Sequence, residues 1–194
     1  MDRDSIAELH FVGLKNPRYS ANNVLLRLLR DGQIKRSTSF VPYVYFGAET
    51  SMKKNSAKIN HFLAILDVYK EMRKLGALEA FQVEPKYGRK GEAAEPDIYA
   101  CFRKTGFFIE VQRTIYSEKQ MNEKLARYVD LYNSGHVAKP FPHVLILGDQ
   151  RYAIEGDYPF RVFQAESFAS FMVSLRQALS PVSPINSGIK VKVQ

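Results

Sequence analysis

The chain has 194 residues, of which 45% are hydrophobic and 12% aromatic, so it can bury a real core and is not globally disordered. Its net charge of +8, with an isoelectric point near 9.5, favours a polyanionic partner such as nucleic acid. No run is long and apolar enough to span a bilayer, and the first residues lack a signal-peptide pattern, so we expect a cytoplasmic protein. The single cysteine, Cys101, excludes an internal disulfide framework and a zinc site built from cysteines.

The first fifty residues predict two helices and a hairpin. Residues 5–14 read as a short helix, and a second helix begins at Ser20, a candidate N-cap, and ends at Gly32. Two strand-like runs follow, at residues 33–40 and 43–46. This order is found in winged-helix DNA-binding domains, although those usually have three helices before the hairpin. Residues 1–50 are therefore interpreted as a winged-helix-like module, truncated or completed by another part of the chain.

Such a module would place its second helix in the major groove and its hairpin along the DNA backbone. The cations expected to contact DNA are those of the second helix and the first strand of the hairpin. They are Arg27, Arg30, Lys35 and Arg36. The alternative is an ordinary helix and hairpin with a solvated basic face, because no base-reading signature is visible.

Residues 51–58 are small and polar and predict a linker, and residues 59–180 then predict an α/β domain. An amphipathic helix ends near Gly76, and three strands follow. After them come a long helix capped by Ser117, a buried strand, a further strand and a last helix. In numbers, the expected strands are 78–84, 95–102, 106–113, 143–147 and 160–163, and the expected last helix is 167–179. Residues 181–194 are expected to form a tail, with a candidate edge strand at 189–193.

Two carboxylates stand on neighbouring strands of this domain. Asp97 opens one strand, and Glu110 lies in the next, two residues before Gln112, so Glu110 and Gln112 should share a face. Mg²⁺ prefers hard oxygen ligands, often one or two carboxylates with water and phosphate. Asp97 and Glu110 are therefore candidate metal ligands, and Glu84 could add a third oxygen from the first strand. The alternative is that Asp97 marks a turn and Glu110 is a solvated residue of an edge strand.

Residues 59–150 resemble the PD-(D/E)XK nuclease-like superfamily, whose core is a helix, a three-strand meander, a helix and another strand. The runs 59–69, 95–97 and 108–114, with 124–128, are most similar to the replication-relaxation proteins of plasmids and mobile elements. The resemblance implies that Asp97 and Glu110 are the metal-binding carboxylates. Gln112 stands where the superfamily has its catalytic lysine, so the resemblance leaves catalysis open unless Lys124, from the following helix, replaces that lysine. Tyr128, one helical turn beyond Lys124, is interpreted as a core residue because it continues the apolar stripe.

The leading hypothesis is a DNA-binding accessory protein of plasmid or mobile-element replication and relaxation, with double-stranded DNA and replication or mobilisation proteins as partners. The enzyme alternative is a Mg²⁺-dependent DNA endonuclease or nickase that uses Asp97, Glu110, Gln112 and Lys124. The third alternative is a non-enzymatic scaffold that binds protein partners. The four histidines show no metal-ligand spacing and are interpreted as surface or core residues; they are His10, His61, His136 and His143.

Overall fold

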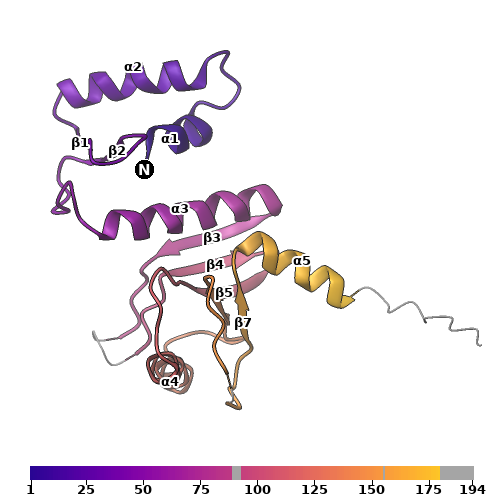
Figure 1. Cartoon of the computed structure of the whole chain (residues 1–194). Helices are drawn as coiled ribbons and strands as arrows, with labels where there is room; N and C mark the ends of the chain where they lie inside the picture. The colour runs from indigo at the N-terminus through magenta and orange to yellow at the C-terminus, as the bar shows by residue number, and fades with distance from the viewer. Residues whose placement is uncertain (89–92, 155, 180–194) are drawn as a thin grey trace, which may run out of the picture.

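The computed structural model describes residues 1–88, 93–154 and 156–179. Over these residues the protein is a mixed α/β structure with five helices, a five-stranded mixed sheet and a separate two-stranded sheet (Figure 1). The mixed α/β class expected from the sequence is thus confirmed. No helix in the described ranges is both long and apolar enough to cross a membrane.

The N-terminal part begins with two helices. Helix α1 (Arg3–His10) is capped by Asp2, whose carboxylate accepts the backbone N–H of Ser5. The N-cap of helix α2 (Pro17–Arg30) is Asn16, four residues before Ser20, so the prediction of Ser20 as its N-cap was wrong. Pro17 occupies the first turn, where a missing N–H costs nothing and the fixed φ suits the helix.

The predicted hairpin is present but short. Strands β1 (Ile34–Ser37) and β2 (Val44–Gly47) pair antiparallel, with Ser37 opposite Val44. The sequence predicted a first run through residue 40, whereas residues 38–43 form the connection between the strands. Ser37 is buried, and its hydroxyl donates to the carbonyl of Lys54, so the segment after β2 folds back against the hairpin.

The five-stranded sheet has the order β3-β4-β5-β6-β7. Strands β3, β4 and β5 form an antiparallel meander, while β6 and β7 are parallel to β5. Helix α4 connects β5 to β6, as a parallel connection requires. The bounds are α3 (Lys58–Leu75), β3 (Leu78–Val83), β4 (Ile98–Phe102), β5 (Thr105–Val111), α4 (Glu118–Ser134), β6 (His143–Leu147), β7 (Val162–Ala165) and α5 (Phe168–Leu179).

Helices cover both faces of the sheet. Helices α3 and α5 pack on one face and α4 on the other, so the domain has three layers (Figure 1). The alternation of β5 divides its side chains between two cores: Ile109 and Val111 face α3 and α5, whereas Phe108 faces α4. The predicted cap of α4 is correct, because Ser117 and Gln120 form a reciprocal capping box.

The turn after β4 and one cysteine within β4 have unusual surroundings. Arg103 and Lys104 form the turn between β4 and β5, and both have positive φ, of 48° and 64°. Arg103 donates to the carbonyl of Leu75 at 2.5 Å and stacks over Phe102, which ties the turn to the end of α3. Cys101 is half-buried on the face of β4 that looks away from α3, and burial raises the pKa of its thiol.

Several expected boundaries were off by a few residues. Strand β7 ends at Ala165 rather than 163, and β4 begins at Ile98 rather than 95. The predicted tail at 181–194, with its candidate edge strand at 189–193, lies outside the described residues.

Candidate functional site

The meander brings the two predicted carboxylates together. Asp97 directly precedes β4, and Ile98 pairs with Ile109 of β5, so the register places Asp97 beside Glu110. The backbone N–H of Val111 donates to Asp97 Oδ2 at 2.7 Å, which fixes the Asp97 carboxylate at the end of β5. Asp97 keeps a side-chain exposure of 20%, whereas the Glu110 side chain is 2% exposed. One carboxylate therefore reaches solvent, and its neighbour lies inside.

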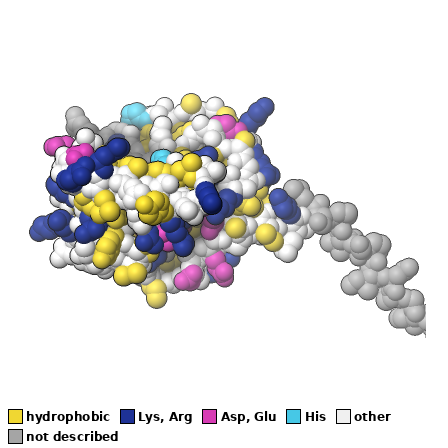
Figure 2. Space-filling model, turned by 90° about the horizontal axis from the view of Figure 1, so that it is seen from above, with side chains coloured by type: hydrophobic (Ala, Val, Ile, Leu, Met, Phe, Trp, Pro, Cys, Tyr) yellow, Lys and Arg dark blue, Asp and Glu magenta, His cyan; other side chains and the backbone are white. Residues whose placement is uncertain are grey.

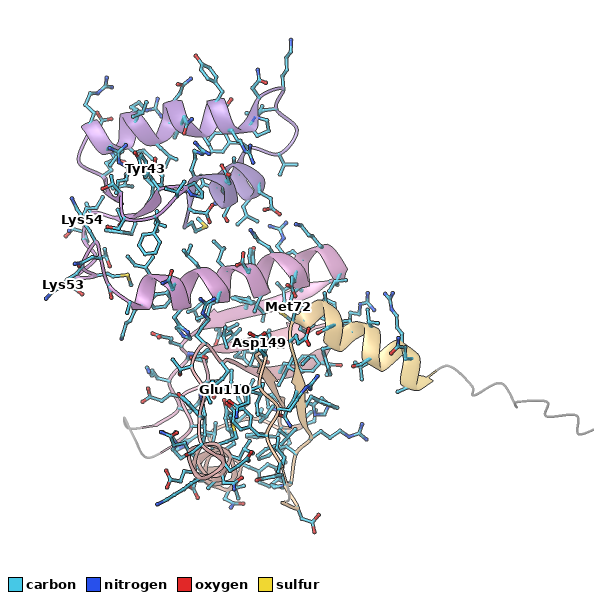
Figure 3. All side chains as sticks on the ribbon, in the orientation of Figure 1. Tyr43, Lys53, Lys54, Met72, Glu110 and Asp149 are labelled. Atoms are coloured by element: carbon cyan, nitrogen blue, oxygen red, sulfur yellow. The ribbon has the colours of Figure 1, made fainter. Side chains whose placement is uncertain are left out.

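Glu110 lies between the sheet and α4 (Figure 3), where two α4 side chains hold it. Lys124 Nζ is 2.5 Å from Glu110 Oε2, and the Tyr128 hydroxyl donates to Glu110 Oε1 at 2.6 Å. Lys124 and Tyr128 are four residues apart and therefore share one face of the helix. Lys124, a candidate site residue in the sequence, thus lies against Glu110. Tyr128 packs in the core as expected and also binds Glu110, which was not predicted.

Burial dominates the electrostatics of this cluster. It raises the pKa of Glu110 to about 7, because desolvation outweighs the attraction of Lys124, and the nearby Asp97 carboxylate adds to the effect. Burial alone would lower the pKa of Lys124, but the Glu110 carboxylate raises it above its usual value. The pKa of Tyr128 is raised well above its usual value by burial and by Glu110. Lys124 therefore stays protonated, while the charge of Glu110 varies near neutral pH.

His61 belongs to this site, and sequence reasoning missed it. Its Nε2 lies 3.1 Å from Asp97 Oδ1, and its side chain is 26% exposed. Helix α3 carries His61 in its first turn, and 36 residues separate it from Asp97. The sequence predicted only a surface or core histidine at position 61, and the structure adds its contact with the Asp97 carboxylate. Its place in the helix that opens the α/β domain was the one available signal.

The structure does not bring Gln112 and Glu84 into the cluster. Strand β5 ends at Val111, and the Gln112 side-chain amide turns to the carbonyl of Thr114 at 2.7 Å, so Glu110 and Gln112 do not share a site as predicted. Glu84 is exposed; its backbone N–H donates to the Asp97 carbonyl, but its carboxylate makes no bond to the cluster. In the described part of the chain, no three His, Cys, Asp or Glu side chains form a metal-binding group.

The predicted DNA-contacting cations differ in their surroundings. Arg27 and Arg30 are exposed on α2, where Arg30 Nε lies 3.5 Å from Asp31. On β1, Lys35 donates to the Thr50 carbonyl at 3.3 Å, and Arg36 stacks over the Tyr43 ring at 4.7 Å. Figure 2 views the molecule from above Figure 1, where α2 is uppermost, and shows basic and hydrophobic side chains intermingled on that side.

Together these contacts define a carboxylate–lysine cluster at the C-terminal end of β5, the central strand of the mixed sheet: Asp97, Glu110, Lys124, Tyr128 and His61. Comparisons with protein-family models, with curated proteins and with solved structures found no similar protein. The arrangement offers hard oxygen atoms for a divalent cation and a protonated lysine beside them. It is suited to chemistry on an anionic group such as a phosphodiester.

Proposed function

We propose that the chain is a DNA-binding protein of plasmid or mobile-element replication and relaxation, whose α/β domain is a PD-(D/E)XK-type nuclease domain with Mg²⁺-dependent phosphodiesterase activity. The order of α3, the β3–β5 meander, α4 and β6 supports this proposal, because it matches the core that the sequence resembles. The observation that carries the proposal is the ion pair between Lys124 and Glu110, with 2.5 Å between Nζ and Oε2. The next residue of β5, Val111, binds the Asp97 carboxylate through its backbone N–H. In this proposal Lys124 supplies the positive charge that Gln112 lacks.

Two carboxylates with water and phosphate are a usual ligand set for Mg²⁺. The four oxygens of Asp97 and Glu110 already have partners, so a bound ion would displace at least one of these contacts. Asp97 and Glu110 would hold the ion, which supplies charge neutralisation on the phosphate and activation of a water molecule. Lys124 holds a positive charge beside both carboxylates and offers its ammonium protons to phosphate oxygens. Tyr128 fixes the Glu110 carboxylate from the other side through a bond of 2.6 Å. His61 and the Val111 N–H orient Asp97, so its carboxylate is set before DNA arrives.

Helix α2 is the proposed DNA-contacting element. Its sequence contains three arginines and no acidic residue, and Arg27 and Arg30 are both exposed. Excess cations on one exposed helix attract the phosphate backbone of DNA and make its binding depend on salt. The proposed winged-helix-like arrangement is supported by the order of α1, α2 and the β1–β2 hairpin.

Plasmid nicking tests the cleavage proposal. Purified protein with supercoiled plasmid and Mg²⁺ or Mn²⁺ should produce open-circular DNA. Asp97→Asn and Lys124→Gln should each abolish the product. Asp130→Asn, a matched change at an exposed site of α4, should leave it intact. Unchanged circular dichroism spectra would show that the variants are folded. If the wild-type protein yields no metal-dependent nicking, or if Asp97→Asn nicks normally, the cleavage proposal fails.

The burial of Glu110 favours a second candidate, a DNA-binding accessory protein whose site does not cleave. Glu110 is 1% exposed and already neutralised by Lys124, so it is held as an internal ion pair that a metal would have to open. In that case DNA binding persists without nicking. Gel-shift titrations should show affinity that falls with salt and is weakened by Arg27→Ala, whereas Lys119→Ala on the exposed face of α4 should change it little. The absence of any DNA binding at low salt would favour the scaffold alternative.

A further inference from the structure

An apolar cleft lies where the N-terminal part of the chain meets α3 and β3. Its volume is about 340 Å³, within the range of small-molecule pockets. Five separate segments line it: the start of the chain, β2, the connection after β2, α3 and β3. We propose that this cleft is a binding site for a neutral, apolar, aromatic small molecule that bridges the N-terminal part and the α/β domain.

The two faces of α3 explain why the cleft exists. One face packs in the core of the domain through Ile65, Val68 and Met72. The helix also carries Leu66 and Tyr69 into the cleft, where both remain only partly buried. Figure 1 shows α3 lying between the N-terminal elements and the sheet. Apolar residues therefore occupy a second face of α3 outside the domain core. On this face Leu66 and Tyr69 are only partly buried by the N-terminal part of the chain.

The lining selects the chemistry of the ligand. None of the lining side chains carries a charge, and the five aromatic rings are those of Tyr45, Phe46, Phe62, Tyr69 and Phe81. A charged ligand would lose its hydration without meeting a side chain of opposite charge, which is costly. A neutral aromatic ligand would instead replace water against apolar side chains and meet ring faces and edges. Nucleotides and phosphates are therefore poor occupants of this cleft.

Polar contacts hold the N-terminal part in place beside the cleft. The Glu8 carboxylate of α1 lies 3.3 Å from Lys70 Nζ and 2.8 Å from Lys74 Nζ, and Lys70 also donates to Ser5 Oγ at 3.2 Å. These contacts engage the C-terminal half of α3, whereas the cleft lies against residues 59–69 of the helix. The N-terminal part is thus fixed at one half of α3 and leaves apolar space at the other. A ligand there would contact β2, α3 and β3 at once.

Fluorescence titration of the full chain with N-phenyl-1-naphthylamine tests this site. The probe is neutral, aromatic and brighter in apolar surroundings. We expect saturable binding of one probe per chain and a rise in the melting temperature when the probe is present. Leu66→Trp fills the cleft with an indole, and we expect it to weaken probe binding by about tenfold or more. Val173→Trp is the matched control, because residue 173 is exposed on α5, away from the cleft.

The chain contains no tryptophan, so each variant carries a single indole, and the emission of residue 66 should also report burial. If Leu66→Trp does not fold, Leu63→Trp on the same lining replaces it. Non-saturable probe binding, or equal affinity in the cleft-filled and control variants, would overturn the proposal. The assay contains neither DNA nor metal, so its outcome is independent of the proposed DNA cleavage.

Discussion

At the scale of single residues, Glu110 is a buried carboxylate with a strongly raised pKa. Its carboxylate is buried between the sheet and α4, where Lys124 and Tyr128 are its partners. The folded-state pKa of about 7 lies above the ordinary value of 4.5. The stabilising contribution of the protonated group is therefore complete below about pH 4.5 and is lost as the pH rises through about 7. Above that pH, Lys124 is the cation that makes the buried carboxylate tolerable.

Replacing Lys124 with methionine should consequently destabilise the fold in a pH-dependent way. At pH 8 the change leaves an unpaired buried carboxylate, and we expect a loss of about 3 kcal/mol in the free energy of unfolding. At pH 5 Glu110 is protonated, so the loss should be much smaller. Urea denaturation at both pH values measures the difference. The double variant Glu110→Gln/Lys124→Met should lose the pH dependence, and equal losses for the single variant at pH 5 and pH 8 would contradict this account.

Tyr128 should contribute through its hydroxyl as well as its ring. The change Tyr128→Phe keeps the ring packing but leaves Glu110 Oε1 without its donor, and we expect a cost of about 1–3 kcal/mol. Tyr132→Phe is the control on the same helix, because its hydroxyl accepts a hydrogen bond from the exposed Lys139. Its cost should stay below about 1 kcal/mol. Thermal and urea unfolding compare the two variants, and similar costs would argue against a structural role for the buried bond.

At the scale of elements, sequence patterns predicted the sheet and its helices because those patterns are local. Apolar periodicity located α3 and α4, and the Ser117 cap located the start of α4. The start of α2 was misplaced because a serine was preferred over Pro17 as the start signal. In the site, Asp97, Glu110 and Lys124 were within reach of sequence reasoning.

The contact between His61 and Asp97 could not be predicted from local sequence patterns, because the two residues are 36 positions apart. The role of Tyr128 could have been suspected, because a tyrosine in a buried stripe needs a partner for its hydroxyl.

Replacing the second residue of the β4–β5 turn with glycine should stabilise the fold. Lys104 is exposed and has a φ of 64°, a conformation that glycine adopts without the Cβ conflict of other residues. We expect Lys104→Gly to raise the free energy of unfolding by about 1 kcal/mol. Lys119→Gly, in the first turn of α4, should instead lower it by about 1 kcal/mol. Chemical denaturation of both variants checks the prediction, which fails if Lys104→Gly is destabilising.

At the scale of the whole molecule, the N-terminal part and the α/β domain are joined by one exposed segment. Residues 48–57 contain no helix or strand, and Lys53 and Lys54 lie at its outer side (Figure 3). Cations and apolar residues mix on the α2 side (Figure 2), whereas Glu110 of the carboxylate cluster lies beyond α3 (Figure 3). The proposed DNA contact and the proposed phosphate chemistry would therefore lie in different parts of the chain.

Limited trypsin digestion should therefore cut first after Lys53 or Lys54. Both lysines are exposed in a segment without regular secondary structure, which proteases favour. Mass spectrometry of the earliest fragments should find one cut that separates the N-terminal part from the α/β domain. A double Lys53→Gln/Lys54→Gln variant should resist that cut while the later ones persist. Early cleavage inside α3 or α4 instead would contradict the assignment of this segment as the connection.

The position of Cys101 has a practical consequence for spectroscopy. It is the single thiol of the chain, it is half-buried on β4, and its raised pKa makes alkylation slow at neutral pH. A maleimide dye or spin label can therefore be attached at one defined point of the central sheet, at mildly alkaline pH, without removing any other cysteine. Together with a second label introduced on α2, this label would allow the distance between the N-terminal part and the α/β domain to be measured in solution.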